Sequence, residues 1–296
     1  MTDTYHKANH PAAIHFPGAQ GWKALKALGE AALILVFTLL NIVPVLWGVL
    51  TSFKAESDIA VYPPRILDFT PTLDNYRTIF NGGISQAFLN SLVYTLATIG
   101  ISLFIGMLAA YGMRRHRFPG RKLLFYAVLS GIPLSCGSAA LVICDYVFFS
   151  KLGMMDSRYT LILIYAGYHL PMSIWTMKGG LDGIPVEIEE AASIDGCSRS
   201  YIILSLIPRL NGPAMISVAI LTFIGTWNEY IVASVMINTT ELRPLQVVVY
   251  NFMGYFGLQW GPLCAASGVS IVFLLLIFSI LGKYLVSGLM QGAVKG

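Results

Sequence analysis

Charged residues are scarce in this sequence. They make up 11% of its 296 residues, against roughly 25% in soluble domains. Hydrophobic residues make up 56%, and the mean hydropathy is +0.68. Such a composition cannot cover a soluble surface, so it indicates a membrane protein. It also leaves no room for a separate soluble enzyme domain.

Motifs for catalysis and metal binding are missing as well. The Gly-Lys pair at Gly282-Lys283 is followed by Tyr284 and lacks the upstream glycine of a P-loop. No H-E-x-x-H motif and no metal-ligand spacing occurs in the sequence. We therefore expect that this chain is not an enzyme and binds no cofactor or metal.

Cysteines are few and show no C-x-x-C spacing. This predicts small buried hydrophobic side chains rather than disulfides or a metal site. The net charge is +4, but nucleic-acid binding is not expected, because the basic residues follow the membrane topology. The cysteines are Cys136, Cys144, Cys197 and Cys264.

Six apolar runs are long enough to cross a bilayer, since a helix needs about 20 apolar residues for this. The sequence predicts an all-α polytopic membrane protein with a transmembrane permease domain at 29–286, between an N-terminal tail (1–28) and a C-terminal tail (287–296). We expect kinks where proline lies inside a span. The runs are 29–51, 87–113, 123–149, 158–178, 212–236 and 263–286.

The distribution of Lys and Arg predicts the orientation of the chain. With the N-terminus inside, 13 of the 19 basic residues fall on the cytoplasmic side and six outside. An even number of spans then places both termini in the cytoplasm. The densest basic cluster, residues 113–122, is interpreted as a positive-inside anchor, with a lipid or phosphate site as the alternative.

Ionisable residues within the spans are candidates for function, because they are costly in a membrane. Asp145 and His169 are two of them, although the first can reach the interface and the second can be structural beside Pro171. The string Trp227-Asn228-Glu229-Tyr230 combines stacking surface, amide and carboxylate, which suits the hydroxyls and C–H faces of a sugar. Interhelical packing or gating is the alternative role for this string.

A polar loop at 183–213 separates two of the spans. Pro185 favours the first position of a short helix, and three glutamates in its first turns suit the helix dipole. Asp195-Gly196 is expected to end this helix, Ser198 to cap a second segment, and Pro208 to stop it. An apolar stripe is expected along the first helix at Ile184, Ile188, Ala191 and Ala192.

This loop resembles the EAA loop of permease subunits of ATP-binding-cassette importers, in their carbohydrate-importer branch. The resemblance implies that the loop is a coupling helix that docks into a cleft of the ATPase subunit. Pro208 departs from the pattern, since it comes one residue early after Gly196. The residues implied in ATPase coupling are Glu190, Ala191, Ala192, Asp195 and Gly196.

The resemblance continues along most of the chain after residue 30. Asn90-Ser91, Ala109-Ala110-Tyr111 and the Trp227–Tyr230 string are similar to features of the same branch. The end of the chain is similar to the tail of the second, maltose-type permease subunit, which reaches between the ATPase subunits. The tail residues implied in that contact are Gly292, Ala293, Val294, Lys295 and Gly296.

The resemblance thus implies a permease subunit of an ATP-driven sugar or polyol importer in a bacterial or archaeal inner membrane. Its expected partners are two ATP-binding cassette subunits that hold ATP and magnesium, a second permease subunit, an extracytoplasmic sugar-binding protein and membrane lipid. In such a heterodimer one permease subunit can supply most of the sugar contacts, and this chain can be the other subunit, which supplies few.

Two other classes of function remain open from the residues alone. An ion-gradient-driven secondary transporter would use Asp145, His169 and Glu229 as a proton relay. A docking loop counts against it, because a self-contained transporter does not need one. A membrane-embedded enzyme would need a convergent catalytic set, which the sequence lacks.

Overall fold

The structure, a computed structural model, describes residues 19–135, 139–254 and 257–293. Side chains are described for 26–133, 141–254 and 257–280. Cys136, Val294, Lys295 and Gly296 therefore lie outside the described residues, as do most of the N-terminal tail and the side chain of Ala293. The chain divides into two units, 1–50 and 51–296.

The first unit is described from residue 19 and is a single helix in that part. Helix α1 (Ala19–Ser52) has 34 residues and contains Pro44. Its large apolar side chains between Leu33 and Trp47 are exposed. A helix that is apolar on all sides is stable where lipid replaces water, so α1 has the character of a membrane span.

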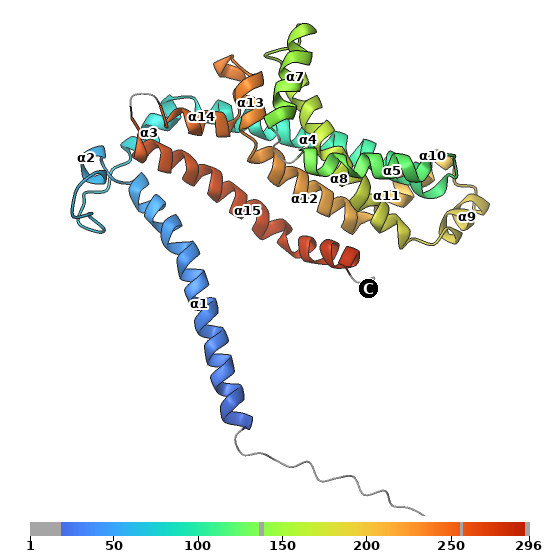
Figure 1. Ribbon diagram of the computed structural model, residues 1–296, viewed down its shortest axis with the longest axis horizontal. Helices are drawn as coiled ribbons and strands as arrows, with labels where there is room; N and C mark the ends of the chain where they lie inside the picture. Colours follow the sequence, from blue (N-terminus) through green and yellow to red (C-terminus); the bar gives the residue numbers. More distant parts are fainter. Residues whose placement is uncertain (1–18, 136–138, 255–256, 294–296) are drawn as a thin grey trace, which may run out of the picture. The chain divides into compact units, whose positions relative to one another are not determined.

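Four long helices form the centre of the second unit (Figure 1): α4 (Ile84–Arg115), α8 (Arg158–Asp182), α12 (Gly212–Trp227) and α15 (Trp260–Ala293). Helix α4 packs along α8 and also against α12, which lies between α4 and α15. Small residues permit the close approach, as where Gly106 of α4 meets Ser173 of α8. These contacts bury three apolar clusters along the helices.

Shorter helices connect and extend this centre. Among the described residues no strand occurs, and the all-α membrane fold expected from the sequence is confirmed. The shorter elements are α2 (Glu56–Ile59), α3 (Asp74–Asn81), α5 (Arg121–Leu129), α6 (Gly131–Ser135), α7 (Ala139–Lys151), α9 (Glu187–Ile194), α10 (Arg199–Tyr201), the π-helix η1 (Ile202–Leu206), α11 (Ile207–Leu210), α13 (Ile231–Met236), the 3-10 helix η2 (Thr240–Leu242) and α14 (Leu245–Asn251).

Not every predicted span is a continuous helix. Within the part of the chain that the structure describes, three helices are long and apolar enough to cross a membrane, namely Lys26–Ser52, Ile84–Arg115 and Trp260–Ile280. The pair Arg199–Leu210 and Gly212–Trp227, bent by 77°, makes a fourth if it is one span. The expected spans at 29–51, 87–113 and 263–286 thus lie on continuous helices.

The prediction of single helices was wrong at two places. The segment 123–149 is divided among α5, α6 and α7, and α5 ends at Leu129, just before Ser130-Gly131. The segment 212–236 is broken between Trp227 and Ile231. Helix α8 covers 158–178 without a break and keeps Pro171 inside it.

The cysteine prediction was half right. Cys144, Cys197 and Cys264 are free, as expected, but Cys144 is exposed and the other two are only partly buried. Burial was the wrong expectation because a membrane protein can carry small apolar side chains on its outward surface, where lipid replaces water.

Candidate functional site

Helix α9 (Glu187–Ile194) forms the first half of the polar loop. It begins two residues after Pro185, with Val186 at its N-cap. Gly196 has a φ of +85°, and its amide donates to the Ser193 carbonyl at 3.1 Å while the Cys197 amide donates to Ala192 at 2.9 Å. This pair of bonds is a Schellman motif, so the expected end of the helix at Asp195-Gly196 is confirmed.

The second half of the loop begins with the expected cap. The Ser198 hydroxyl accepts the Tyr201 amide at 3.2 Å. The helix does not stop at Pro208, however, and this prediction was wrong. The π-helix η1 precedes Pro208, with the Ile207 amide bonded to the Ile202 carbonyl. In a π-helical turn an amide bonds to the carbonyl five residues back, so fewer bonds between residues i and i−4 are needed. The helix therefore tolerates Pro208, which has no amide hydrogen, and continues to Leu210.

One face of α9 is open and carries most of the residues assigned to coupling. Glu190, Ala191, Asp195 and Gly196 are exposed, whereas Ala192 is partly buried against the apolar cluster between α4 and α8. Ile194 is 86% exposed. The expected apolar stripe is therefore split, since Ile184 and Ala192 face the core while Ile188 and Ala191 are exposed. An exposed face that mixes apolar side chains with carboxylates suits a protein partner.

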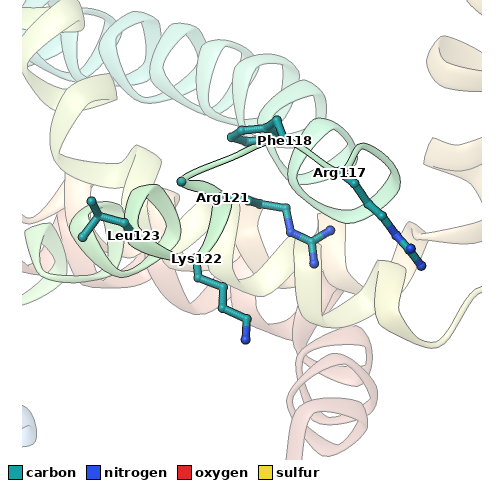
Figure 2. A pocket seen from close by; sticks show the side chains of 6 residues that line it. Arg117, Phe118, Arg121, Lys122 and Leu123 are labelled. Carbon is teal, nitrogen blue, oxygen red and sulfur yellow. The ribbon is translucent and has the colours of Figure 1, made fainter.

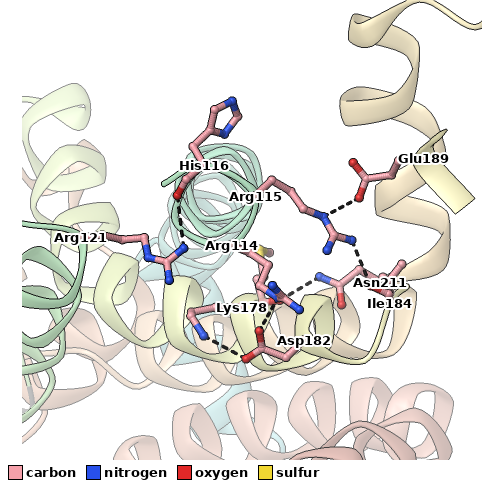
Figure 3. Close-up of polar contacts among 10 residues, drawn as sticks. Arg114, Arg115, His116, Arg121, Lys178, Asp182, Ile184, Glu189 and Asn211 are labelled. Carbon is pink, nitrogen blue, oxygen red and sulfur yellow. Dashed lines mark hydrogen bonds and ion pairs between the residues drawn. The ribbon is translucent and has the colours of Figure 1, made fainter. Parts of the chain in front are cut away.

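The neighbouring carboxylate, Glu189, lies in the core instead, with only 8% of its surface exposed. It accepts hydrogen bonds from the Tyr111 hydroxyl at 2.8 Å and the Arg115 Nε at 2.6 Å. Arg115 also donates to the Ile184 carbonyl at 3.0 Å (Figure 3). We call Tyr111, Arg115 and Glu189 the latch. It joins the end of α4 to α9.

Sequence reasoning did not identify the latch. Tyr111 and Arg115 are four residues apart and so share one face of a helix, which was a usable signal. Arg115, however, was read only as part of the basic cluster. Nothing in the sequence pattern separates Glu189 from the exposed Glu187 and Glu190.

Further polar contacts tie the same ends of α4, α8 and α12 together (Figure 3). Asp182 pairs with Arg114 at 2.6 Å and with Lys178 at 2.9 Å. Asn211, in the bend before α12, is buried and donates to the Met177 carbonyl at 3.2 Å. Gly180 lies directly against the Asn211 side chain.

The Trp227–Tyr230 string lies where the fifth predicted span breaks. Glu229 accepts the amides of Val232 at 2.8 Å and Ala233 at 3.1 Å, so its carboxylate caps the start of α13. It also accepts the Tyr165 hydroxyl at 2.7 Å. In this conformation, Glu229 therefore has a structural role, because its bonds join the start of α13 to Tyr165 of α8.

The other three members of the string have different environments. Trp227 is 1% exposed and packs with three phenylalanines, and its indole donates to the Ser270 hydroxyl at 3.1 Å. Asn228 is exposed, and Tyr230 stacks on Tyr250 with ring centroids 3.9 Å apart. Asn228 therefore presents the most surface that a solute could reach here, Tyr230 and Glu229 present less, and Trp227 is buried.

Asp145 and His169, the other ionisable candidates within the predicted spans, have separate environments. Asp145 accepts the Tyr168 hydroxyl at 2.5 Å. The His169 ring packs against Gly225 so closely that a Cβ at this glycine would overlap it. No hydrogen bond or ion pair joins any two of Asp145, His169 and Glu229, all of which the structure describes.

The opposite end of α4 holds a second polar cluster. Asn90 donates to the carbonyls of Glu241 at 2.7 Å and Arg243 at 3.1 Å, and the Ser91 hydroxyl accepts the Leu245 amide at 2.8 Å. The Asn90-Ser91 pair seen in the sequence thus fixes the loop around η2 to α4.

Asp156 fixes the start of this same loop, outside the helices. Its carboxylate accepts the Thr239 hydroxyl and the amides of Asn238 and Thr239. The bond from the Thr239 hydroxyl is the largest of the effects that lower the pKa of Asp156 below its ordinary value. Asp156 has a φ of +58° and was not predicted as a site.

Metal binding finds no support in the described ranges, where no group of three or more His, Cys, Asp or Glu is close enough to hold an ion.

The described residues form an all-α membrane protein in which an exposed helix, α9, is bonded to the end of the long helix α4. Residues 102–291 match the family described as binding-protein-dependent transport system inner membrane component. The chain belongs to this family, so it is a permease component of an ABC transporter in a membrane, not an enzyme. The alternative of a secondary transporter is not favoured.

Relatives of known assignment agree. The chain is 33% identical to the trehalose transport system permease protein SugB of Mycobacterium tuberculosis, covering 86% of this chain and 93% of that protein. It is 30% identical to the trehalose/maltose transport system permease protein MalG of Thermococcus litoralis, covering 88% and 94%. The resemblance found in the sequence is thereby confirmed.

The fold agrees with a solved structure. A chain from a bacterial ABC transporter involved in the import of the acidic polysaccharide alginate superposes with a TM-score of 0.75 at 19% identity. The match covers 92% of this chain and 99% of the other.

Proposed function

We propose that this chain is a permease subunit of an ATP-driven importer of a sugar or polyol, and that α9 couples it to separate ATPase subunits. The substrate class rests on the trehalose and maltose relatives, both similar over most of their length. The coupling role rests on one observation. The exposed face of α9 carries Glu190 and Ala191, while the buried face is bonded to α4 by the latch.

The latch supplies a route for movement. ATP binding would bring the two ATPase subunits together, and each would carry the helix docked in it. A docked α9 pulls on Arg115 and Tyr111, which lie on the last turns of α4. Because α4 packs along α8 and α12, movement of its end can reorient the spans as a group.

The solute path is proposed at the break between α12 and α13. Asn228 offers an exposed amide and Tyr230 an aromatic ring, and both suit a sugar. Trp227 and Glu229 hold the break in shape, and His169 packs beside α12. All five stay candidates for the path, and the second permease would supply the rest of it.

The proposed assembly follows from this arrangement. It contains two ATP-binding cassette subunits, a second permease, and a sugar-binding protein on the outer side. Both termini of this chain would lie in the cytoplasm, as the Lys and Arg distribution predicts. ATP and magnesium would bind only to the cassette subunits.

Replacing Glu190 by Lys tests the coupling role. We expect Glu190→Lys to abolish sugar-stimulated ATP hydrolysis, because it reverses a charge on the docking face while leaving the latch intact. The tagged chain is purified in mild detergent, the co-purifying subunits are identified by mass spectrometry, and ATP hydrolysis is measured after reconstitution.

Glu241→Lys is the matched control, since Glu241 is exposed and far along the chain in η2. Loss of the ATPase subunit in Glu190→Lys alone supports the proposal. Normal coupling in that variant would show that α9 is not the docking element. A chain that purifies alone and still transports would overturn the importer function itself.

A further inference from the structure

A pocket lies in the turn between α4 and α5, inside the basic cluster (Figure 2). Its volume is about 330 Å³, and it is lined by Arg117, Phe118, Gly120, Arg121, Lys122 and Leu123. Figure 2 shows the side chains of Arg117, Arg121 and Lys122 extending from one short segment of chain. Three positively charged side chains therefore surround one pocket.

The basic cluster divides into paired and unpaired residues. Arg114 is neutralised by Asp182 and Arg115 by Glu189, each at 2.6 Å. Across the described residues, no carboxylate lies within ion-pair distance of Arg117, Arg121 or Lys122. Arg121 makes only a bond of 3.3 Å to the His116 carbonyl. Positive-inside anchoring accounts for the number of charges, but not for the concentration of the unpaired ones around a pocket.

The backbone adds to the positive potential of the pocket. Gly120, with a φ of +81°, turns the chain into α5, which begins at Arg121 and has no side-chain cap. The first amides of a helix carry a partial positive charge and favour an anion. With the three side chains, they define a site for a phosphate group.

Apolar side chains continue from the pocket along α5. Leu123 is 75% and Tyr126 66% exposed, and Leu124 is exposed as well. A free phosphate would not contact this apolar surface, whereas the acyl chains of a lipid would pack against it. We propose that the pocket binds the phosphate of an anionic phospholipid and that the exposed face of α5 contacts its acyl chains.

Native mass spectrometry of the full-length chain in mild detergent tests this. The chain is titrated with phosphatidylglycerol and with phosphatidylcholine of the same acyl chains. We expect wild type to bind phosphatidylglycerol at about tenfold lower concentration or less, because each nearby Lys or Arg strengthens attraction to an anionic head group. The variant Arg117→Gln, Arg121→Gln, Lys122→Gln is expected to lose this preference.

Two controls separate the site from net charge and from misfolding. The variant Arg77→Gln, Lys151→Gln, Arg209→Gln removes the same formal charge from exposed positions outside the pocket and should keep the preference. The variant Arg117→Lys, Arg121→Lys keeps the charge and should also keep it. Equal loss of preference in both glutamine variants would refute a specific site.

Two further experiments distinguish a bound lipid from a free anion. Leu123→Asn should weaken phosphatidylglycerol binding, and an excess of inorganic phosphate should not displace the lipid. Displacement by phosphate, with no effect of Leu123→Asn, would assign the pocket to a soluble phosphate and overturn the lipid assignment. Wild type without any preference would overturn the proposal as a whole.

Discussion

Adjacent carboxylates on α9 have opposite environments. Successive residues of a helix are about 100° apart, so Glu190 is exposed while Glu189 is buried beside Arg115. Arg115 is buried too, with 7% of its side chain exposed. A buried arginine depends on its carboxylate, because an unpaired charge in the interior is costly. Glu189 therefore stabilises the fold through Arg115, while Glu190 is exposed and accessible to a partner.

Replacing Glu189 by Gln should separate these roles. We expect Glu189→Gln to lower stability by about 3 kcal/mol, because it leaves the Arg115 guanidinium buried without a counter-charge. Sugar-stimulated ATP hydrolysis should fall while the ATPase subunit still co-purifies, since the exposed face of α9 is unchanged. Thermal unfolding of the purified chain and ATP hydrolysis after reconstitution are the measurements.

Glu187→Gln is the control, because Glu187 undergoes the same chemical change on the exposed face of the same helix. Its stability should stay within about 0.5 kcal/mol of wild type. Equal unfolding midpoints for the two variants would mean that the latch does not stabilise the chain. Loss of the ATPase subunit in Glu189→Gln would show that the latch shapes the docking face rather than transmitting its movement.

Among the elements, α8 and the bend before α12 meet at a glycine. Gly180 lies against the Asn211 side chain, and a Cβ there would also meet Ala214. Asn211 in turn holds the Met177 carbonyl. This contact sets the distance between α8 and α12 at the end where α9 is attached.

Gly180→Ala should therefore force these helices apart. We expect a loss of stability of about 1–3 kcal/mol, the usual cost of overpacking, together with weaker coupling. The adjacent Gly179 has nothing within 4 Å of its Cβ direction, so Gly179→Ala is a matched control that should be neutral or stabilising. A Gly180→Ala variant as stable as Gly179→Ala, measured by thermal unfolding, would contradict the packing argument.

Elements with a local cause could be predicted from the sequence. The end of α9 at Gly196 and the cap at Ser198 depend on neighbouring residues, and both were found correctly. The break between α12 and α13 was not predicted, because the run is apolar on both sides and the sequence does not show that Glu229 caps α13 and bonds the distant Tyr165. The latch escaped prediction for the same reason, since Glu189 and Arg115 are distant in sequence.

Over the whole molecule, α4 connects the two polar clusters. One end carries the latch to α9, and the other holds the loop around η2 through Asn90 and Ser91. With 32 residues at 1.5 Å each, α4 is about 48 Å long, enough to cross a membrane. A helix bonded at both ends can carry a movement of α9 to the opposite surface.

The last prediction concerns the tail and rests on its resemblance to the maltose-type permease. We expect deletion of Gly292–Gly296 to lower sugar-stimulated ATP hydrolysis several-fold, because a tail that reaches between the ATPase subunits adds contacts that α9 does not supply. Co-purification of the ATPase should persist, since α9 stays intact. Replacing the tail by a glycine-serine segment of equal length separates sequence from length. Full activity of the deletion would refute a tail contact and leave α9 as the sole coupling element, whereas full activity of the replacement alone would mean that the tail acts through its length.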